Sequence, residues 1–417
     1  MLLITNIKKL ILAEEKPRKW VAGAGMAALP CIDDAFLLID EGIIKNFGTM
    51  DKTPGVPAGA TTIDAAGRMV FPSFCDAHTH LVYAGSREIE YSDKIRGLSY
   101  GEIARRGGGI LNSTKQLHHT SEEELYAQAL TRINELIELG TGAVEIKSGY
   151  GLNTADELKM LRVIKKLKET TPLTIRATFL GAHAVPEAYK GRQTAYVDLL
   201  INEMLPQVAA EHLADYIDVF CDKGFFTVED TKRILTAGLK YGLPGKIHAN
   251  ELAFSQGIQT GVKYGALSVD HLEFTGKEEI ACLLSSETMP TLLPGAAFFL
   301  GMNYPPARAM IDAGLPIALA SDYNPGSSPS GDMKFVLSLA CIKMKMLPGE
   351  TIQAATLNGA YAMGISDTHG SIARGKTANV FLTKPIPSYE FMPYAYTTKL
   401  VDKVILNGAV IPRSPQI

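Results

Sequence analysis

The sequence has few cysteines, and they are not arranged to bind a metal or to form a disulfide framework. The five cysteines are odd in number, lie far apart and include no Cys-x-x-Cys pair. These features argue against a disulfide-stabilised secreted fold and against a thiolate zinc site. A reducing, cytoplasmic environment is expected instead.

The sequence also lacks a strong charge of one sign and any long hydrophobic run. Its formal net charge is only -3, which excludes a strong electrostatic attraction to nucleic acid. No apolar run reaches the roughly 20 residues that span a membrane, and no basic leader precedes the apolar N-terminal residues. We therefore expect a globular protein that acts on a small molecule, with neither nucleic acid nor membrane as a partner.

The length of the chain and its pattern of short apolar runs predict more than one domain. At 417 residues it exceeds the size at which a single hydrophobic core usually stops growing. Short apolar runs separated by glycine, proline and aspartate fill residues 1–68, and the same pattern of residues occurs again in residues 371–417. Both ends are predicted to build one flanking β-sandwich domain around a central domain at residues 69–370.

The central residues alternate between strand-like and helix-like segments. Capping residues near Thr120 and Thr154 precede apolar residues at helical spacing, which predicts a helix at each place. Eight strands are predicted at 69–71, 143–146, 173–180, 216–220, 245–247, 267–269, 289–293 and 316–320. Eight such strands over about 300 residues predict an α/β fold of the (β/α)8 TIM barrel type, whose chemistry lies at the carboxyl ends of the strands.

Polar side chains suited to metal binding and catalysis follow five of these strands. They are His78 and His80 after the first, His183 after the third, His248 and Glu251 after the fifth, His271 and Glu273 after the sixth, and Asp322 after the eighth. Imidazole and carboxylate groups suit zinc or ferrous iron. A metal site with one position left open for water is predicted, with the ligands His78, His80, His248 and Asp322.

Each of these residues alone also fits a structural role. His248 or His271 could be a hydrogen-bonded core histidine, and Asp322 could cap the helix that follows it. Arg87 could form a surface ion pair, and Glu251 could be a surface carboxylate. The coincidence of ligand types at the ends of strands one, five, six and eight favours a catalytic metal site. His118 and His119 lie in a polar stretch and are predicted to face solvent.

The histidine pair after strand one, the histidines after strands five and six and the aspartate after strand eight resemble the amidohydrolase superfamily. This resemblance covers the whole chain, including the split β domain, although Asn379 stands where many members have aspartate. A narrower resemblance is to the superfamily's ring-opening hydrolases of histidine degradation. It rests on residues 78–85 with Arg87, and on 145–151, 179–186, 270–273 and 321–328.

The narrower resemblance implies hydrolysis of the cyclic amide of 4-imidazolone-5-propanoate to N-formimidoyl-L-glutamate. It implies one divalent or ferric ion, zinc or iron, and a homodimer. It also implies substrate contacts from Arg87, Tyr150 and His183. Glu251 at the same site, and Asn324, Gly326 and Ser327 after Asp322, could add substrate contacts, although Asn-Pro-Gly could equally be only a turn.

The chemistry of the residues suggests catalytic roles. Glu251 is the candidate to take a proton from water and deliver it to the leaving ring nitrogen. His271 would stabilise the developing oxyanion or orient the nucleophile, and Asp322 would combine metal ligation with proton transfer. Lys147 could be a carboxylated lysine that bridges two metals, but it follows strand two rather than strand four, so one ion is expected.

Two other functions remain possible on the same residues. A mononuclear-metal deaminase of the superfamily that acts on a nitrogen heterocycle would use His248, Glu251, His271 and Asp322, and it would release ammonia. A non-catalytic scaffold could also keep the barrel. Such scaffolds typically lose metal ligands, whereas this chain keeps every expected one.

Overall fold

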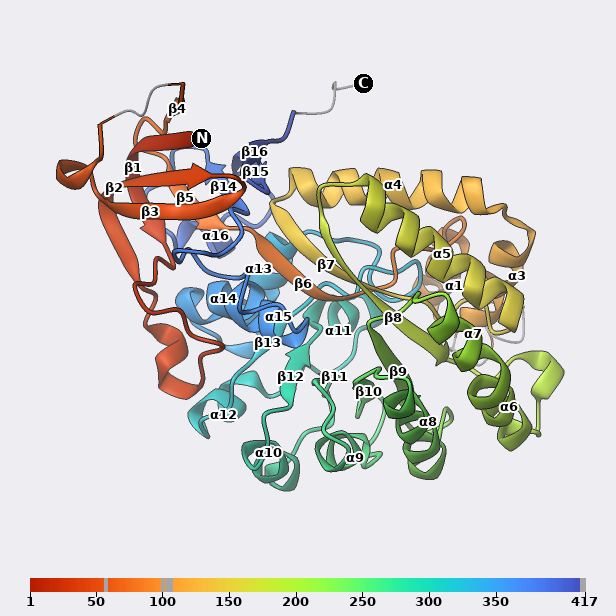
Figure 1. The fold of residues 1–417 in the computed structure, drawn as a ribbon. Helices are drawn as coiled ribbons and strands as arrows, with labels where there is room; N and C mark the ends of the chain where they lie inside the picture. The colour runs from red at the N-terminus through yellow and green to blue at the C-terminus, as the bar shows by residue number, and fades with distance from the viewer. Residues whose placement is uncertain (56–58, 99–101, 103–107, 413–417) are drawn as a thin grey trace.

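The computed structural model describes residues 1–55, 59–98, 102 and 108–412, and it places them in two eight-stranded sheets flanked by helices (Figure 1). One sheet is the predicted barrel, with all of its strand pairs parallel. Its strands in order are β6 (Phe74–Thr79), β7 (Thr141–Lys147), β8 (Thr174–Ala182), β9 (Tyr216–Cys221), β10 (Gly245–Ala249), β11 (Ser268–His271), β12 (Met289–Leu292) and β13 (Ala318–Leu319).

The barrel is closed by backbone hydrogen bonds just beyond the last strand. The amide of Asp322 donates to the carbonyl of His78 at 3.0 Å, and the amide of His80 donates to the carbonyl of Tyr323 at 2.9 Å. These bonds join the first and last strands of the barrel at their carboxyl ends. The same bonds fix the backbone of three predicted metal ligands.

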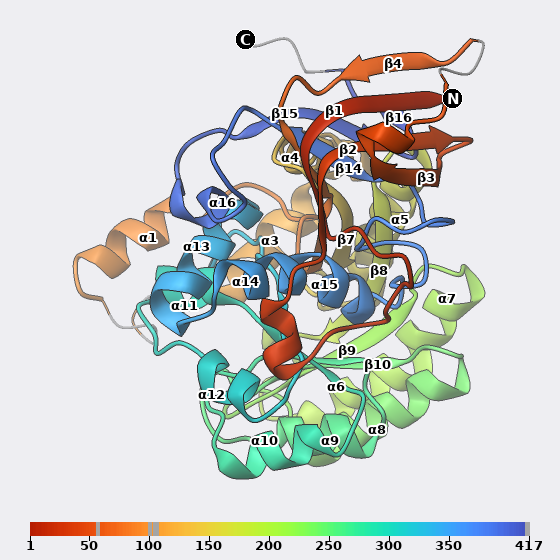
Figure 2. The same ribbon diagram turned by 90° about the vertical axis from the view of Figure 1, so that its left-hand side faces the viewer.

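Helices surround the barrel (Figures 1 and 2). Ser121 caps α4 (Glu122–Glu138) by accepting a hydrogen bond from the amide of Glu124, and Asn153 caps α5 (Thr154–Thr170) by accepting one from the amide of Asp156. The cap of α5 is therefore one residue earlier than the predicted Thr154. The helices after β6 are α1 (Glu88–Ile95), α3 (Ile110–His119), α4 (Glu122–Glu138), α5 (Thr154–Thr170), α6 (Gln193–Leu199), α7 (Leu205–Ala210), α8 (Val228–Lys240), α9 (Gly257–Lys263), α10 (Lys277–Leu284), α11 (Pro294–Leu300), α12 (Ala307–Asp312), α13 (Met333–Met344), α14 (Pro348–Ala355), α15 (Leu357–Ala362) and α16 (Phe391–Tyr394).

The second sheet is built from both ends of the chain. Its strands are β1 (Leu2–Ile11), β2 (Cys31–Asp40), β3 (Ile43–Thr49), β4 (Thr61–Asp64), β5 (Met69–Pro72), β14 (Val380–Thr383), β15 (Val401–Leu406) and β16 (Ala409–Val410). The N-terminal and C-terminal parts meet where β5 pairs with β14, with Phe71 opposite Phe381. Their rings stack with centroids 5.3 Å apart.

One strand prediction is wrong. Residues 69–71 were expected to be the first barrel strand, but they lie in β5 of the smaller sheet, parallel to β1 and antiparallel to β14. The first barrel strand is β6, and the two sheets meet between β5 and β6 rather than after residue 68. Both segments are short, apolar and buried, so composition alone does not show which sheet each one joins.

The interior of the barrel beneath the carboxyl ends is charged rather than purely apolar. Glu145 and Lys147 on β7, Asp218 on β9 and Lys246 on β10 are buried, and their side chains pair with one another.

Within the described residues, no helix is long and apolar enough to cross a membrane.

Candidate active site

The side chains predicted to bind a metal converge at the carboxyl end of the barrel. All of them are buried, and each comes from or directly follows a barrel strand. Together with His271, which was not predicted to be a ligand, their nitrogen and oxygen atoms form two overlapping groups that could hold a metal ion, with the ligand atoms of each group within 4.8 Å of one another. The groups are His78, His248 and His271, and His78, His80 and Asp322.

His78 belongs to both groups because of its position on β6. Side chains two residues apart on a strand point to the same face, so His78 and His80 lie together. Their Nε2 atoms are 3.3 Å apart. Oδ1 of Asp322 lies 3.5 Å from Nε2 of His78 and 3.6 Å from Nε2 of His80. Three candidate ligand atoms therefore surround one point.

Two buried aspartates orient the histidines toward that point. Nδ1 of His78 lies 2.7 Å from Oδ2 of Asp270, and Nδ1 of His248 lies 3.1 Å from Oδ2 of Asp218. The hydrogen bond at Nδ1 of His78 leaves its Nε2 facing the other candidate ligands, whereas among the described residues neither Nδ1 nor Nε2 of His248 makes a hydrogen bond. A carboxylate behind each imidazole is the usual arrangement around a metal-binding histidine.

The electrostatic environment keeps two of these imidazoles neutral, as a metal ligand requires. Burial, followed by nearby cationic and imidazole groups, holds the pKa of both His78 and His80 well below the usual range. The burial, the free Nε2 atom and the carboxylate partners together show that this donor set fits a metal ion.

The backbone is held in an unusual conformation at two of the candidate residues. His271 has a φ of 84° and Asp322 a φ of 54°, a region that residues with side chains rarely adopt. The next residue, Leu272, is held by a hydrogen bond from its amide to the carbonyl of Ala249. Strain of this kind is concentrated at functional sites, where it aims side chains into the site.

Glu251 lies in the loop that follows β10. Oδ2 of Asp222 accepts hydrogen bonds from the amides of Glu251 and Leu252 at 2.7 and 2.9 Å, which fixes the loop. Burial, together with the charges of Glu273 and Asp322, raises the pKa of Glu251 to about 7. Its carboxyl group can therefore both accept and release a proton near neutral pH.

His271 lies between two carboxyl groups. Its Nε2 is 3.7 Å from Oε2 of Glu251, and its Nδ1 is 3.8 Å from Oε1 of Glu273. Burial lowers the pKa of His271, but these two carboxylates outweigh burial and raise it to about 10. A protonated ring favours the predicted role as a donor to developing negative charge, although the ring also lies close enough to His78 and His248 to be a ligand.

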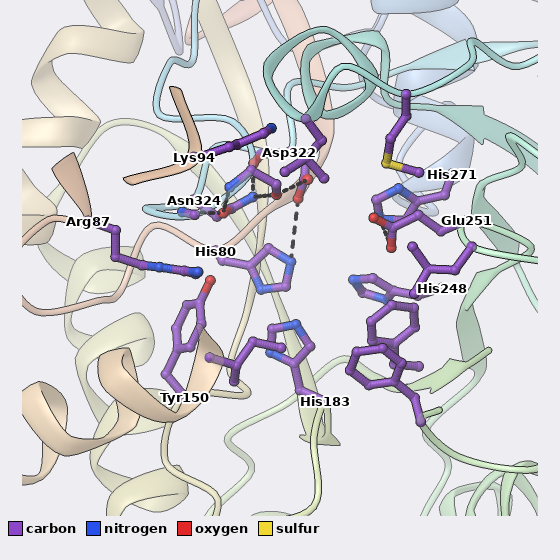
Figure 3. Close-up of a pocket in the computed structure, with 18 of the residues that line it drawn as sticks. His80, Arg87, Lys94, Tyr150, His183, His248, Glu251, His271, Asp322 and Asn324 are labelled. Carbon is purple, nitrogen blue, oxygen red and sulfur yellow. Dashed lines mark hydrogen bonds and ion pairs between the residues drawn. The ribbon is translucent and has the colours of Figure 1, made fainter. Parts of the chain in front are cut away.

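Opposite the imidazole cluster, the same cavity of about 420 Å³ has a wall suited to an anionic substrate (Figure 3). Arg87 points inward from the start of α1 and lies near Tyr150. Nε and Nη2 of Arg87 lie 2.8 and 2.7 Å from Oε2 of Glu90. The side chain of Arg87 is only 12% exposed, so this pair is not the solvated surface ion pair that was the alternative.

His183 and Tyr150 complete this wall. Nδ1 of His183 lies 3.0 Å from the carbonyl of Gly149, and its ring stacks on His80 with centroids 5.1 Å apart. Burial lowers the pKa of His183 to about 3, so its ring is neutral at physiological pH.

The turn after Asp322 also lines the cavity. Oδ1 of Asn324 accepts hydrogen bonds from the amides of Gly326 and Ser327, each at 2.8 Å. Oγ of Ser327 donates to Oδ2 of Asp322 at 3.1 Å. The Asn-Pro-Gly sequence is therefore a turn, and Asn324, Gly326 and Ser327 also line the cavity.

The structure brings all the predicted site residues together and adds others that were missed. His78 lies beneath the cavity, and the remaining predicted residues line it. Asp218, Asp222 and Asp270 were missed as partners, although Asp270 directly precedes His271 in the sequence. Lys94, which also lines the cavity, carried no recognisable signal.

The predictions for two other histidines are confirmed. His118 and His119 are exposed, and the side chain of His118 is 63% exposed while it pairs with Asp156 at 2.8 Å. Neither residue lines the cavity.

The chain is similar to known proteins over almost its whole length. Residues 69–411 match the Amidohydrolase family. The chain is 56% identical over 409 residues to imidazolonepropionase of Flavobacterium johnsoniae, covering 98% of this chain and 99% of that protein. It is also 56% identical over 410 residues to imidazolonepropionase of Christiangramia forsetii, covering 98% and 100%. Among solved structures, atrazine chlorohydrolase from Arthrobacter aurescens, complexed with zinc, superposes with a TM-score of 0.69 at 17% identity, covering 98% of this chain and 95% of that one.

Proposed function

The chain belongs to the amidohydrolase family and, within it, to the imidazolonepropionases, and we propose that its cavity opens the ring of 4-imidazolone-5-propanoate by hydrolysis. The bond cleaved is the cyclic amide C–N bond, and the product is N-formimidoyl-L-glutamate. One observation carries this proposal. A single cavity has Arg87 on one side and the cluster of His248, His271 and Glu251 on the other (Figure 3).

We propose one metal ion, zinc or iron, at the imidazole cluster. Its ligands would be His78, His80, His248 and Asp322, whose chemistry suits either metal. A divalent ion in such a site supplies a hydroxide nucleophile near neutral pH, because it lowers the pKa of water to about 7.

Glu251 would move the proton that the reaction requires. Its carboxylate takes a proton from the attacking water and delivers it to the ring nitrogen that leaves. A pKa of about 7 suits both transfers, because a group near the working pH neither binds the proton too tightly nor fails to accept it. The two amide hydrogen bonds to Asp222 hold the backbone of Glu251 in place during these transfers.

His271 and Asp322 would stabilise charge beside the reacting carbonyl. His271 lies next to Glu251 and donates to the oxygen that becomes negative. Asp322 serves as a ligand and assists proton transfer, and the hydroxyl of Ser327 orients its second oxygen.

Arg87 would bind the propanoate carboxylate, because a guanidinium group offers forked donors to a carboxylate. Tyr150 and His183 would position the ring beside the imidazole cluster. Asn324, Gly326 and Ser327 would shape the adjoining wall, and Asn324 holds this turn rigid through its two accepted hydrogen bonds.

The reaction is tested with freshly generated 4-imidazolone-5-propanoate and with metal-loaded and chelator-stripped protein. The expected result is N-formimidoyl-glutamate from the loaded protein alone, restored on adding zinc or iron. Loaded protein that forms no product would refute the assignment, and release of ammonia from a nitrogen heterocycle would show a deaminase instead.

The proton-transfer role is tested with Glu251→Gln. This variant should bind metal normally and lose about 10²- to 10⁴-fold in kcat, the usual contribution of a general base. Glu273→Gln is the matched control, because Glu273 is also a buried carboxyl beside His271. The loss of kcat in Glu251→Gln beyond that in Glu273→Gln measures the proton transfer, apart from the effect that either carboxyl has on His271. A Glu251→Gln protein with full turnover would eliminate the role.

We further propose that the chain forms a homodimer through the side of the molecule that carries α1 and α11. Ile89 and Ile95 on α1 are each 69% exposed, and Phe298 on α11 is 52% exposed. Tyr91 on α1 stacks on Phe299 on α11 with ring centroids 5.2 Å apart, so the two helices that carry these exposed apolar side chains contact each other. Light scattering should give twice the chain mass, and replacement of Ile89 and Ile95 by aspartate should give the monomer.

A further inference from the structure

A buried lysine lies beneath the imidazole cluster. Lys147 ends β7, and its side chain is fully buried. Its Nζ atom lies 2.6 Å from Oε1 of Glu145, 2.7 Å from Oδ2 of Asp218 and 3.4 Å from Oδ2 of Asp270. One ammonium group is therefore shared by three buried carboxylates, which lie on β7, β9 and β11.

Two of these carboxylates are the ones that orient histidines. The Oδ2 atom of Asp218 that meets Lys147 is also 3.1 Å from Nδ1 of His248. The Oδ2 atom of Asp270 that meets Lys147 is also 2.7 Å from Nδ1 of His78. Lys147 therefore reaches two histidines on different strands indirectly, through the carboxylate oxygens that lie within 3.1 Å of their Nδ1 atoms.

We propose that Lys147 is a positioning residue that holds Asp218 and Asp270, and through them His248 and His78, in the orientation that binds metal. The inference rests on the proposed metal site and deepens it. Without the ammonium group, the buried carboxylates of Asp218 on β9 and Asp270 on β11 would lose their shared counterion. Each would then move or take up a proton, and the imidazole that it orients would lose its fixed position.

The same contacts argue against a carboxylated lysine. Burial lowers the pKa of Lys147, but Asp218, Glu145 and Asp270 outweigh burial and raise it above the usual range. The amino group is therefore protonated and has no free lone pair to react with carbon dioxide. Glu145 and Asp218 also accept hydrogen bonds from the amino group, and Asp270 lies 3.4 Å from it.

The barrel interior supplies a matched control in Lys246. This lysine is also fully buried, and it pairs with the other oxygen of Glu145 and with the carbonyl of Ala362 at 3.1 Å. In the described residues, the hydrogen bonds and the ion pair of the Lys246 side chain do not reach Asp218 or Asp270, although the backbone of Lys246 pairs with that of Asp218 between β10 and β9. Lys246 is nearer in sequence to His248 than Lys147 is, so any general disturbance of the barrel should affect its variant at least as strongly.

The test compares Lys147→Met and Lys246→Met by zinc affinity, measured by competition with a chromophoric chelator. We expect Lys147→Met to bind zinc about 10- to 100-fold more weakly, the usual effect of losing an outer partner of a metal site. Lys246→Met should bind zinc with nearly the parent affinity. The visible spectrum of the Co²⁺-loaded protein should change in Lys147→Met and not in Lys246→Met, because it reports ligand geometry.

Equal zinc affinities for Lys147→Met and the parent protein, or equal losses in both methionine variants, would overturn the inference. A parent protein that binds no zinc, iron or cobalt would instead refute the proposed metal site. The two failures are therefore distinguishable.

If Lys147→Met does not fold, the double variant Lys147→Met/Asp218→Asn is compared with Asp218→Asn alone. Removing the cation together with one of its carboxylates leaves less uncompensated charge in the interior. Lys147 still holds Asp270 in the single variant, so the double variant should bind zinc about tenfold more weakly. Equal affinities would overturn the inference.

Discussion

The guanidinium group of Arg87 lies directly against the backbone of Gly326. A Cβ atom added at Gly326 would lie 1.9 Å from Nη1 of Arg87 and 2.6 Å from its Cζ. A side chain at position 326 fits only if the guanidinium group of Arg87 moves away. Glycine at position 326 therefore lets Arg87 lie against the turn after Asp322, and this turn and the start of α1 form one wall.

Replacing Gly326 with alanine should displace Arg87 from this wall. We expect kcat/KM to fall about 10- to 100-fold, because a lost hydrogen bond to a charged group costs about 1.5–3 kcal/mol. Steady-state kinetics with 4-imidazolone-5-propanoate measures this. In an Arg87→Ala background the same substitution should have little further effect. Additive losses in the two variants would show that Gly326 acts independently of Arg87.

Glu90 should keep Arg87 oriented for substrate. Its carboxylate accepts from Arg87 and also from the amide of Gly109 at 2.9 Å and Nδ2 of Asn112 at 2.8 Å. Glu90→Gln should raise KM about tenfold with little change in kcat, since it removes a charge-assisted bond remote from the reacting carbonyl. The exposed Glu88, on the same helix, provides the control Glu88→Gln. An unchanged KM in Glu90→Gln would contradict this role.

Gly359 in α15 should be essential for close packing against β6. A Cβ atom at this position would lie 2.3 Å from the carbonyl oxygen of Cys75. Gly359→Ala should lower the free energy of unfolding by about 1–3 kcal/mol, the usual cost of overpacking a core. Gly55→Ala is the control, because a Cβ atom there has no neighbour within 4 Å among the described residues. Denaturant unfolding of both variants checks the prediction.

His369 should make the folded state sensitive to acid. Its Nε2 lies 3.0 Å from Oγ1 of Thr174, and burial, followed by the charges of Lys376 and Arg176, lowers its pKa to about 4. Between the ordinary pKa of 6.5 and about 4, the unfolded chain binds a proton that the folded protein does not. Stability is therefore present above pH 6.5 and is lost as the pH falls through this window.

The measurement is the free energy of unfolding of the parent protein and of His369→Gln, at pH 7.5 and at pH 4.5. Glutamine keeps a polar side chain but does not titrate. The parent should lose more stability on acidification than the variant, by up to about 3 kcal/mol. Equal losses in the two proteins would show that His369 contributes nothing to the acid sensitivity.

Much of the site could be predicted because its features are local in sequence. His78 and His80 lie together simply because a strand alternates its faces every second residue. The carboxyl ends of parallel barrel strands meet at one mouth, so residues after different strands were expected to converge, and they do. The expectation of a barrel with a sheet built from both chain ends needed only the order of strands and helices.

Other features could not be predicted because they depend on residues that are distant in sequence. The apolar residues 69–71 read as a strand, but only pairing with β1 and β14 places them in the smaller sheet. His369 offered no sequence signal for its contact with Thr174. The missed aspartates Asp218 and Asp270 are ordinary strand residues until the fold places them behind histidines.

The sequence by itself determined which side chains stand at the carboxyl ends of the strands, because strand period and element order are set by neighbouring residues. Only the tertiary structure decided which of these side chains meet, and which buried charges lie behind them. Lys147 is one lysine among many in the sequence. Its contacts with Asp218 and Asp270 follow from strand register and barrel closure, and both are properties of the whole chain.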